Sequence, residues 1–301
     1  MNRIALAIAA ALFALPVWAA TPIDQTRPLS ATGEVHIENL KGNIIVRTWA
    51  RPEVRITGSL GKGVEKLDIS GDANALDIEV KYPNSRGGWG LWGSDDRSEP
   101  TRLEVTLPQR AALSIESVSA DVDVQQVAGR KLEISSVSGN IVVTASSPGE
   151  ARFENVSGDT TLRITTPKAH LESVSGDVKL SGGLDGEVSL ETVSGDLELG
   201  AKTLSFLKTS TVSGDSSLRF GLKPNATVKA ETLSGELVVT MPSATRARLH
   251  AESFSGDIES PVGKVDSEEH GPGKSLDTRL GDGSADLHLE SFSGDVRIVL
   301  E

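Results

Sequence analysis

Apolar and polar residues alternate through almost the whole chain after its first twenty residues. Residues 113–124 have the order Leu-Ser-Ile-Glu-Ser-Val-Ser-Ala-Asp-Val-Asp-Val, with apolar residues at every second position on both sides of a Ser-Ala-Asp triplet. A period of two is typical of β-strands that bury one face. β-Branched residues and Ser-Gly turns dominate, so we expect strands and few helices after the amino-terminal segment.

The pentapeptide Ser-Val-Ser-Gly-Asp at residues 173–177 recurs with small variations along the chain. Its glycine returns every 18 to 21 residues between positions 139 and 256, and once more at 294. Glycine reaches backbone angles that other residues avoid, and Ser and Asp side chains bond nearby amides, so the motif predicts a turn. The predicted turn glycines are Gly139, Gly158, Gly176, Gly195, Gly214, Gly235, Gly256 and Gly294.

A fixed period of this size predicts stacked units. Short strands with about 19 residues per coil predict an all-β, single-chain parallel β-helix in which each coil adds about 4.8 Å of height. The apolar residue at the centre of each turn motif is expected to point into the core and to stack on its equivalents in the neighbouring coils. These central positions are Leu40, Val118, Val137, Val156, Val174, Val193, Val212, Leu233, Phe254 and Phe292.

The amino terminus has the features of a secretory signal. Arg3 precedes an apolar run that is short for a membrane span, and small residues favour cleavage after Ala19, with Ala20 as the alternative. We therefore expect a signal peptide at 1–19, a β-helix domain at 20–301, and loop insertions at about 83–100 and 261–283. No later apolar stretch is long enough to cross a membrane, so the mature chain is expected in the periplasm or outside the cell.

Composition narrows the classes of partner. The formal net charge is −12, which argues against nucleic acid and against adsorption to anionic lipid headgroups. The chain has no cysteine, so neither disulfides nor cysteine–metal sites are expected.

With the Glu-Asn-Leu-Lys-Gly-Asn-Ile unit at 38–44 and the Ser/Thr-x-Ser-Gly-Asp array in view, the chain resembles a bacterial envelope β-strand-repeat family of unknown function that is labelled "putative adhesin". The family is similar to the β-helical head domains of auto-transporter adhesins. The resemblance covers about residues 35–300. It implies an extracytoplasmic parallel β-helix, right-handed, and it brings no catalytic residues.

Two acidic columns are expected along the coils. One contains Asp159, Asp177, Asp196 and Asp215, and the other contains the glutamate that precedes each turn, such as Glu172. Stacked carboxylates repel by roughly 1 kcal/mol per pair in a water-like dielectric. Ca²⁺ bridging between coils would offset this repulsion, which makes the four aspartates candidate calcium ligands. Hydrogen bonds to backbone and serine within each turn are the structural alternative, which Asn at 43 and 140 favours.

The remaining candidate functional residues are two tryptophans, the histidines and the serines of the repeat. Trp89 and Trp92 lie in a glycine-rich stretch within the first insertion and are candidate ligand contacts, with packing over an end of the β-helix as the alternative. The five histidines are scattered without a repeated position, and the serine column is a feature of the repeat, so a nucleophilic site is not expected.

These features predict a non-enzymatic binding or scaffold protein of the cell envelope. Its expected partners are an envelope glycan, an envelope protein or divalent cations. The final coil has no evident cap, which predicts either coverage by residues 261–283 or end-to-end self-association. A carbohydrate-active enzyme and an envelope-stress signalling accessory are the alternatives.

Overall fold

The computed structural model describes residues 21–83, 98–267 and 271–301, and within these ranges it contains strands and turns but no helix. The strands are β1 (Thr21–Pro28), β2 (Glu34–Trp49), β3 (Glu53–Leu60), β4 (Lys66–Gly71), β5 (Ala75–Lys81), β6 (Thr101–Pro108), β7 (Ala112–Gln125), β8 (Lys131–Ser138), β9 (Ile141–Ser146), β10 (Glu150–Ser157), β11 (Thr160–Ser175), β12 (Val178–Ser194), β13 (Leu197–Ser213), β14 (Ser216–Ser234), β15 (Leu237–Met241), β16 (Ala247–Ser253), β17 (Ile258–Glu259), β18 (Asp266–Ser267), β19 (Lys274–Leu280), β20 (Ala285–Ser293) and β21 (Val296–Leu300).

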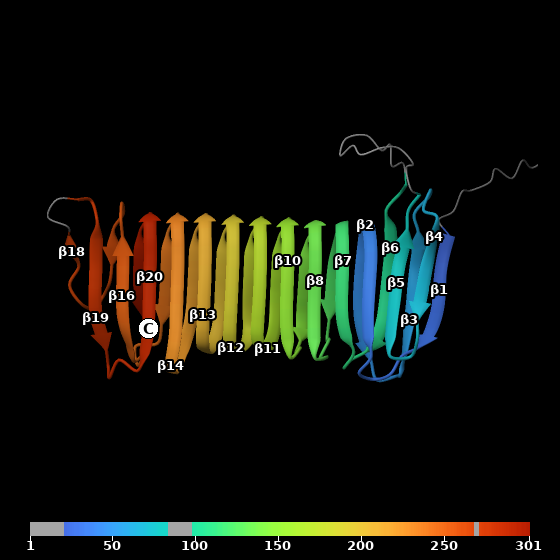
Figure 1. The fold of residues 1–301 in the computed structure, drawn as a ribbon, viewed down its shortest axis with the longest axis horizontal. Helices are drawn as coiled ribbons and strands as arrows, with labels where there is room; N and C mark the ends of the chain where they lie inside the picture. The colour runs from blue at the N-terminus through green and yellow to red at the C-terminus, as the bar shows by residue number, and fades with distance from the viewer. Residues whose placement is uncertain (1–20, 84–97, 268–270) are drawn as a thin grey trace, which may run out of the picture.

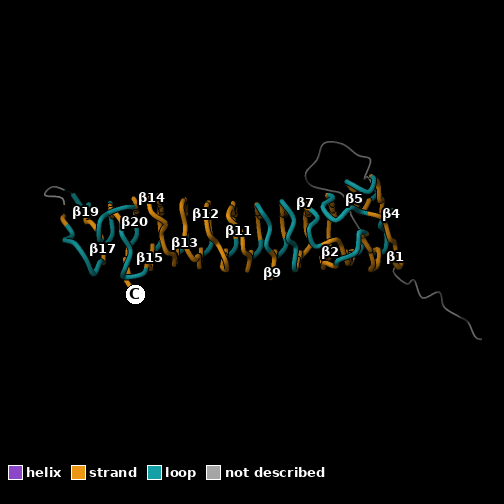
Figure 2. The backbone as a smooth tube through the Cα atoms, turned by 90° about the horizontal axis from the view of Figure 1, so that it is seen from below, coloured by secondary structure: helices purple, strands orange, loops and turns teal. Residues whose placement is uncertain are grey.

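Each coil crosses the molecule twice, and successive coils lie side by side along one long axis (Figures 1 and 2). We call the segments that lead into a Ser-Gly turn the front sheet and the segments that follow the turn the back sheet. In β11, residues 160–166 belong to the back sheet and residues 168–175 to the front sheet, with a register shift between them. Pairing in both sheets is parallel along the middle of the array. The prediction of an all-β repeat solenoid is confirmed, while its handedness stays a prediction.

The core lies between the two sheets and is built from equivalent positions of successive coils. Leu171 pairs with Leu190 in the front sheet, and Val178 pairs with Leu197 in the back sheet, and all four are at most 1% exposed. The core is aliphatic along most of its length, because a two-residue period places Leu, Val, Ile or Ala inside and polar residues outside.

The central apolar residue of the turn motif is exposed, so the prediction that it points into the core is wrong. Side chains alternate without a break through the motif: Leu171 is 1% exposed, Ser173 is 4% exposed, and Val174 is 48% exposed. The inward position beside the turn holds a small polar residue in every coil. In some coils its side chain bonds the turn region, as Asn155 does by donating from Nδ2 to the Gly158 carbonyl over 2.9 Å. Among the described residues, no hydrogen-bond partner is present for the hydroxyls of Ser173, Thr192 and Ser291.

The carboxyl-terminal coils do not stack in chain order. Strand β20 pairs with β14 on one side and with β16 on the other, so the final coil lies between two coils that precede it in sequence. In the back sheet β21 likewise lies between β15 and β17. Figure 1 shows the chain end beside β14 and β20, with β16 and β19 further out. The premise of end-to-end association through the final coil is therefore wrong, because β20 is paired along both edges and β21 is paired with β15 and, at Val296 and Arg297, with β17.

The amino-terminal end has a similar exchange of order. Strand β2 pairs with β7 on one side and with β5 and β6 on the other, although β5 and β6 lie between β2 and β7 in sequence. Antiparallel strands cover both ends of the array. At the amino-terminal end β3 pairs with β6 and β4 with β5, and at the other end β19, from the insertion at 261–283, pairs with β16.

Candidate functional site

The turn edge brings backbone of successive coils into close contact. Gly158, Gly176, Gly195, Gly214 and Gly235 all have φ between 116° and 128°. A Cβ added at Gly195 would lie 2.3 Å from the Gly176 carbonyl oxygen. The other three predicted turn glycines, Gly139, Gly256 and Gly294, have no positive φ, but an added Cβ there would also lie within 2.2 Å of a carbonyl oxygen of the adjacent coil. Close approach therefore favours glycine at these eight positions, whereas Ala120 occupies the equivalent position in β7.

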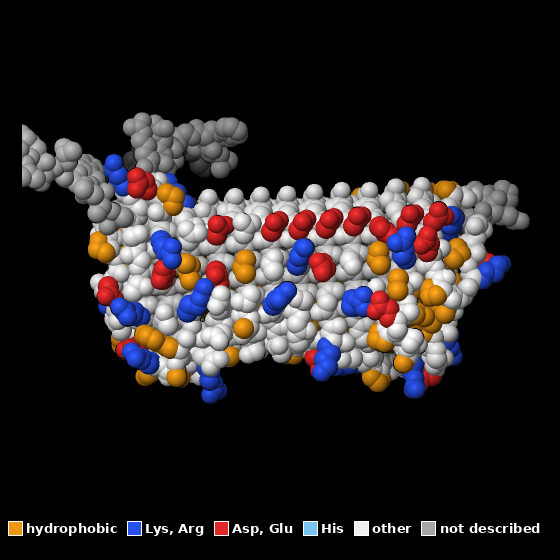
Figure 3. Space-filling view, turned by 180° about the vertical axis from the view of Figure 1, so that it is seen from behind, with side chains coloured by type: hydrophobic (Ala, Val, Ile, Leu, Met, Phe, Trp, Pro, Cys, Tyr) orange, Lys and Arg blue, Asp and Glu red, His pale blue; other side chains and the backbone are white. Residues whose placement is uncertain are grey.

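The aspartate column follows the glycines and forms a row of acidic side chains along one edge of the back face (Figure 3). Each carboxylate accepts a hydrogen bond from the backbone amide of the equivalent residue in the next coil. The Asp177 amide donates to Asp159 Oδ1 over 3.1 Å, and the Asp196 amide donates to Asp177 Oδ1 over 3.1 Å. Asp215 continues the series by donating from its amide to Asp196 Oδ1 over 3.0 Å. The column therefore ties coil to coil, and the bonds do not close within one turn.

These hydrogen bonds involve the four aspartates that are the candidate calcium ligands. One oxygen of Asp159, Asp177, Asp196 and Asp215 is engaged by a backbone amide of the next coil. The amide donors stabilise the stacked carboxylates and so offset part of the repulsion between them. Bound Ca²⁺ would offset the same repulsion. Calcium binding by the second oxygens stays a prediction. The other candidate contacts, Trp89 and Trp92, lie outside the described residues.

A groove of about 1010 Å³ runs along the front sheet beside the turn edge. Its apolar lining is a column that runs from the half-buried Leu40 through exposed valines to Val212, and the glutamates of the second acidic column line its other side. We call these the apolar column and the glutamate column. Beyond the groove the apolar column continues through Leu233, Phe292 and Phe254, and the two phenyl rings stack with centroids 5.0 Å apart.

The end of β5 and the residue after it wall the groove at its amino-terminal end. Tyr82 donates from its hydroxyl to Asn39 Oδ1 over 2.8 Å and to the Lys41 carbonyl over 3.2 Å. Val80 and Lys81 also line this end. The groove is therefore closed at one end and follows the array toward the other.

Basic side chains accompany much of the glutamate column. Arg152 donates from Nε to Glu154 Oε1 over 2.8 Å and from Nη2 to Glu172 Oε1 over 3.5 Å. Lys208 donates to Glu191 over 2.6 Å. Hydrogen bonding to Glu154 raises the pKa of Arg152 above its ordinary value. These pairs are partly exposed, so each contributes at most about 1 kcal/mol to stability.

Four histidines occupy one column of the front sheet, so the prediction that they have no repeated position is wrong. His36, His170, His250 and His288 each lie two residues before a glutamate and contact it through Nε2. Pairing of β16 with β20 places His250 beside His288, and their rings stack with centroids 4.8 Å apart.

We expect the contact between β16 and β19 to weaken as the pH rises. A hydrogen bond from His250 Nδ1 to Asp277 Oδ1, 2.7 Å long, raises the pKa of His250 above its ordinary value of 6.5. A raised folded-state pKa gives stabilisation that is complete below the unfolded pKa and is lost as pH rises through the folded one. Glu252 and His288 are the other titratable neighbours of this ring.

The measurement is hydrogen exchange of the β19 amides at pH 5 and pH 8.5, corrected for the intrinsic rate. Protection should fall by less than about 1 kcal/mol, because His250 is partly exposed. Asp277→Asn should abolish most of this pH dependence. A wild-type protein whose β19 protection is equal at both pH values would contradict the prediction.

The sequence does not lead directly to three of these features. The repeat places the apolar column in the core, although counting alternate positions from Leu171 places Val174 outside. The histidine column has a signal in the repeated His-x-Glu spacing, which on a strand places both side chains on one face. The wall formed by Tyr82 had no signal in the repeat.

Comparison with known proteins gives a family for the chain. The family model described as Toastrack DUF4097 matches residues 33–299. No curated protein matches the chain. Similar solved structures include one described as a "putative adhesin" from Bacteroides fragilis, with 11% identity, coverage of 93% of this chain and 98% of that chain, and a TM-score of 0.45. Another so described, from Parabacteroides distasonis, has 13% identity, the same coverages and a TM-score of 0.42. In the described ranges, no helix has the length and apolar character of a membrane span.

Proposed function

The chain belongs to the Toastrack DUF4097 family, and we propose that it is a non-enzymatic binding module of the bacterial cell envelope whose ligand lies in the front-sheet groove. Its extracytoplasmic location rests on the predicted signal peptide at 1–19, which lies outside the described residues.

The observation that carries the proposal is the exposure of the apolar column. Its side chains from Val118 to Val212 are 43% to 48% exposed and lie in adjacent coils. Contiguous apolar surface of this kind is uncommon on soluble proteins and is typical of interaction sites. Side chains that served only to stabilise the fold would be buried. The alternation along the strands instead places these valines on the surface.

The best fit to the groove is a polypeptide with an apolar ridge flanked by lysine or arginine. The ridge would contact the apolar column, and cationic groups would reach the glutamate column. Seven coils at a spacing of about 4.8 Å give a track of about 29 Å, which holds about five turns of an amphipathic helix. The acidic column disfavours anionic lipid headgroups. Within the groove the apolar column is aliphatic, and the aromatic faces of Phe292 and Phe254 lie beyond it. We therefore favour an envelope protein over a glycan as the partner.

The test is titration calorimetry with a synthetic amphipathic peptide of about 18 residues that has leucine on one face and lysine beside it. The triple variant Val156→Thr, Val174→Thr, Val193→Thr keeps the β-branched shape and adds hydroxyls to the groove. We expect its affinity to fall at least about tenfold. The triple variant Glu154→Gln, Glu172→Gln, Glu191→Gln should bind more weakly and with less dependence on salt.

The matched control is Val142→Thr, because Val142 is 37% exposed but lies in β9 of the back sheet. It should leave binding unchanged. Since the replaced valines are all exposed, each single variant should keep its unfolding free energy within about 0.5 kcal/mol. Equal affinity of wild type and the valine triple variant, or binding of soluble glycan polymers in preference to the peptide, would overturn the proposal.

A further inference from the structure

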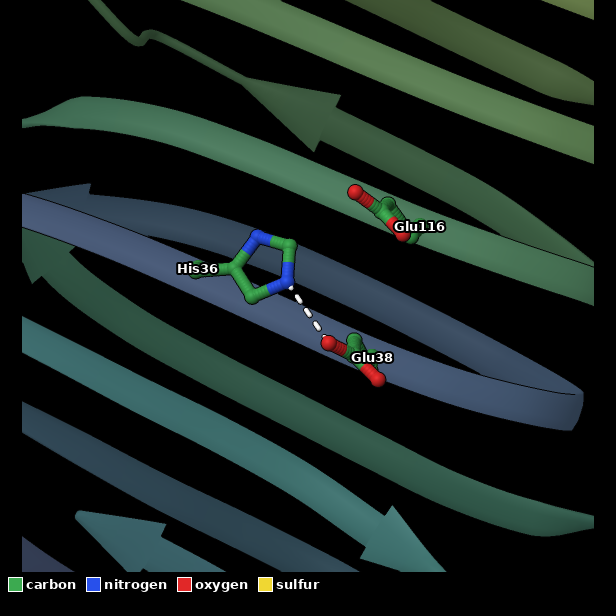
Figure 4. Close-up of side chains that lie close together, drawn as sticks. All are labelled: His36, Glu38 and Glu116. Atoms are coloured by element: carbon green, nitrogen blue, oxygen red, sulfur yellow. Dashed lines mark hydrogen bonds and ion pairs between the residues drawn. The ribbon is translucent and has the colours of Figure 1, made fainter.

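A histidine and two glutamates converge on the front sheet near the amino-terminal end of the groove. His36 and Glu38 extend from β2, and Glu116 extends from the neighbouring strand β7 (Figure 4). One ligand atom from each residue lies within 4.8 Å of the other two, and His36 Nε2 lies 2.9 Å from Glu38 Oε1. The register of β2 and β7 places Glu38 directly beside Glu116, so the paired strands fix the spacing of all three groups.

This cluster differs from the His170 unit in the charges around it. Beside His170 the neighbouring strand carries Arg152, which donates to the glutamates on both strands. The positions that pair with His36 are Ser114 in β7 and Asp77 in β5. Neither supplies a positive charge.

The glutamates at this end share one lysine, because Lys81 interacts with both Glu79 and Glu38. Glu79, Glu38 and Glu116 are in register on three adjacent strands, and Glu79 pairs with Lys81. Across the described ranges, Glu116 has neither a hydrogen bond nor an ion pair. Like charges in register repel, and arginine or lysine offsets that repulsion at Glu154, Glu172, Glu191 and Glu231.

We propose that His36, Glu38 and Glu116 bind a divalent transition-metal ion of the Zn²⁺ class, with water at the remaining positions. Imidazole nitrogen with carboxylate oxygen is a ligand set that suits Zn²⁺, whereas Ca²⁺ and Mg²⁺ take oxygen ligands. The side chains of His36 and Glu38 are 29% and 45% exposed, so an ion can enter from solvent. Glu116 is exposed as well, so its side chain is free to adjust to an ion.

The ion would join coils that are distant in sequence. Strands β2 and β7 are adjacent in space, but β3 to β6 lie between them along the chain. Metal binding should therefore protect the β2–β7 junction and raise the unfolding temperature by mass action. This inference does not depend on what the apolar column binds, because the peptide test and the metal test use different residues.

The experiment is calorimetric titration of Zn²⁺ into tag-free protein in which His250 and His288 are both replaced by Gln. The expected result is one tight equivalent. Affinity should fall at least about tenfold in His36→Gln and in Glu116→Gln. His170→Gln is the matched control, because it removes the same side chain from the same column beside Arg152, and it should leave the affinity unchanged. Co²⁺ in place of Zn²⁺ should give a visible absorption band that is lost in His36→Gln.

Three results would overturn the proposal. One is no saturable Zn²⁺ binding, and another is the same loss of affinity in His170→Gln as in His36→Gln. The third is Ca²⁺ binding at this site as tight as that of Zn²⁺, which would contradict the role of the imidazole. Circular dichroism of each variant distinguishes loss of the site from loss of the fold.

Discussion

Gly195→Ala is expected to lower the free energy of unfolding by about 3 to 5 kcal/mol. Gly195 has φ 116°, which L-residues rarely adopt, and the added Cβ would lie 2.3 Å from the Gly176 carbonyl oxygen and 2.7 Å from its carbon. Backbone cannot yield as a flexible side chain does. The strain would pass to the coil on either side, because Gly176 and Gly214 are stacked in the same way. Equilibrium urea unfolding of the mature protein measures the change.

Gly200→Ala is the matched control for this substitution. Gly200 has no positive φ, and the nearest atom to an added Cβ is Ser181 Cβ at 3.6 Å. Replacing it should leave stability within about 0.5 kcal/mol or raise it slightly, because alanine restricts the unfolded chain. Equal unfolding midpoints for the two variants would show that the turn column tolerates a side chain.

Leu289→Ala is expected to cost about 3 to 5 kcal/mol, measured in the same way. Leu289 is fully buried and its partners in register are Ala230 of β14 and Ala251 of β16. It fills the core where both neighbouring coils have small residues. The substitution would align three alanines and leave a cavity that the rigid sheets cannot close.

Phe292→Ala in the same strand is the control. Phe292 is larger than Leu289 but is 54% exposed, and its main contact is the stacked ring of Phe254. Its removal should cost less than about 1.5 kcal/mol. If Phe292→Ala cost more than Leu289→Ala, the assignment of the apolar column to the surface would be wrong.

The middle of the fold could be predicted from the sequence because each coil repeats the same local signals. The period of the Ser-Gly-Asp motif predicted the stacking, and the alternation on either side predicted which strand residues face inward. The error at Val174 came from treating the turn as a separate unit with its own inward side chain. The alternation in fact continues from Leu171 to Val174, and a small Ser173 occupies the narrow end of the core.

The ends of the array could not be predicted because the repeats are alike. Residues 285–301 have the same pattern as any other coil. Their sequence therefore does not indicate whether this coil stacks after β17 or beside β14. The contact of β20 with β14, and the cap on β16 formed by β19, follow from that choice of neighbour. The cluster of His36 with Glu116 has the same origin, because β7 pairs with β2 only after the chain has returned from β6.

The exchanged order at both ends has a consequence for the kinetics of folding. Bonds between successive coils in the middle join residues 18 to 21 positions apart, as from Asp177 to Asp159 and from Glu236 to Asp215. At the ends Arg47 bonds Asp123 across 76 positions and Arg219 bonds Glu301 across 82. Loop closure slows the formation of distant contacts. We therefore expect the middle coils to form first and both ends to close late, so that β14 keeps an open edge until residues 285–301 are in place.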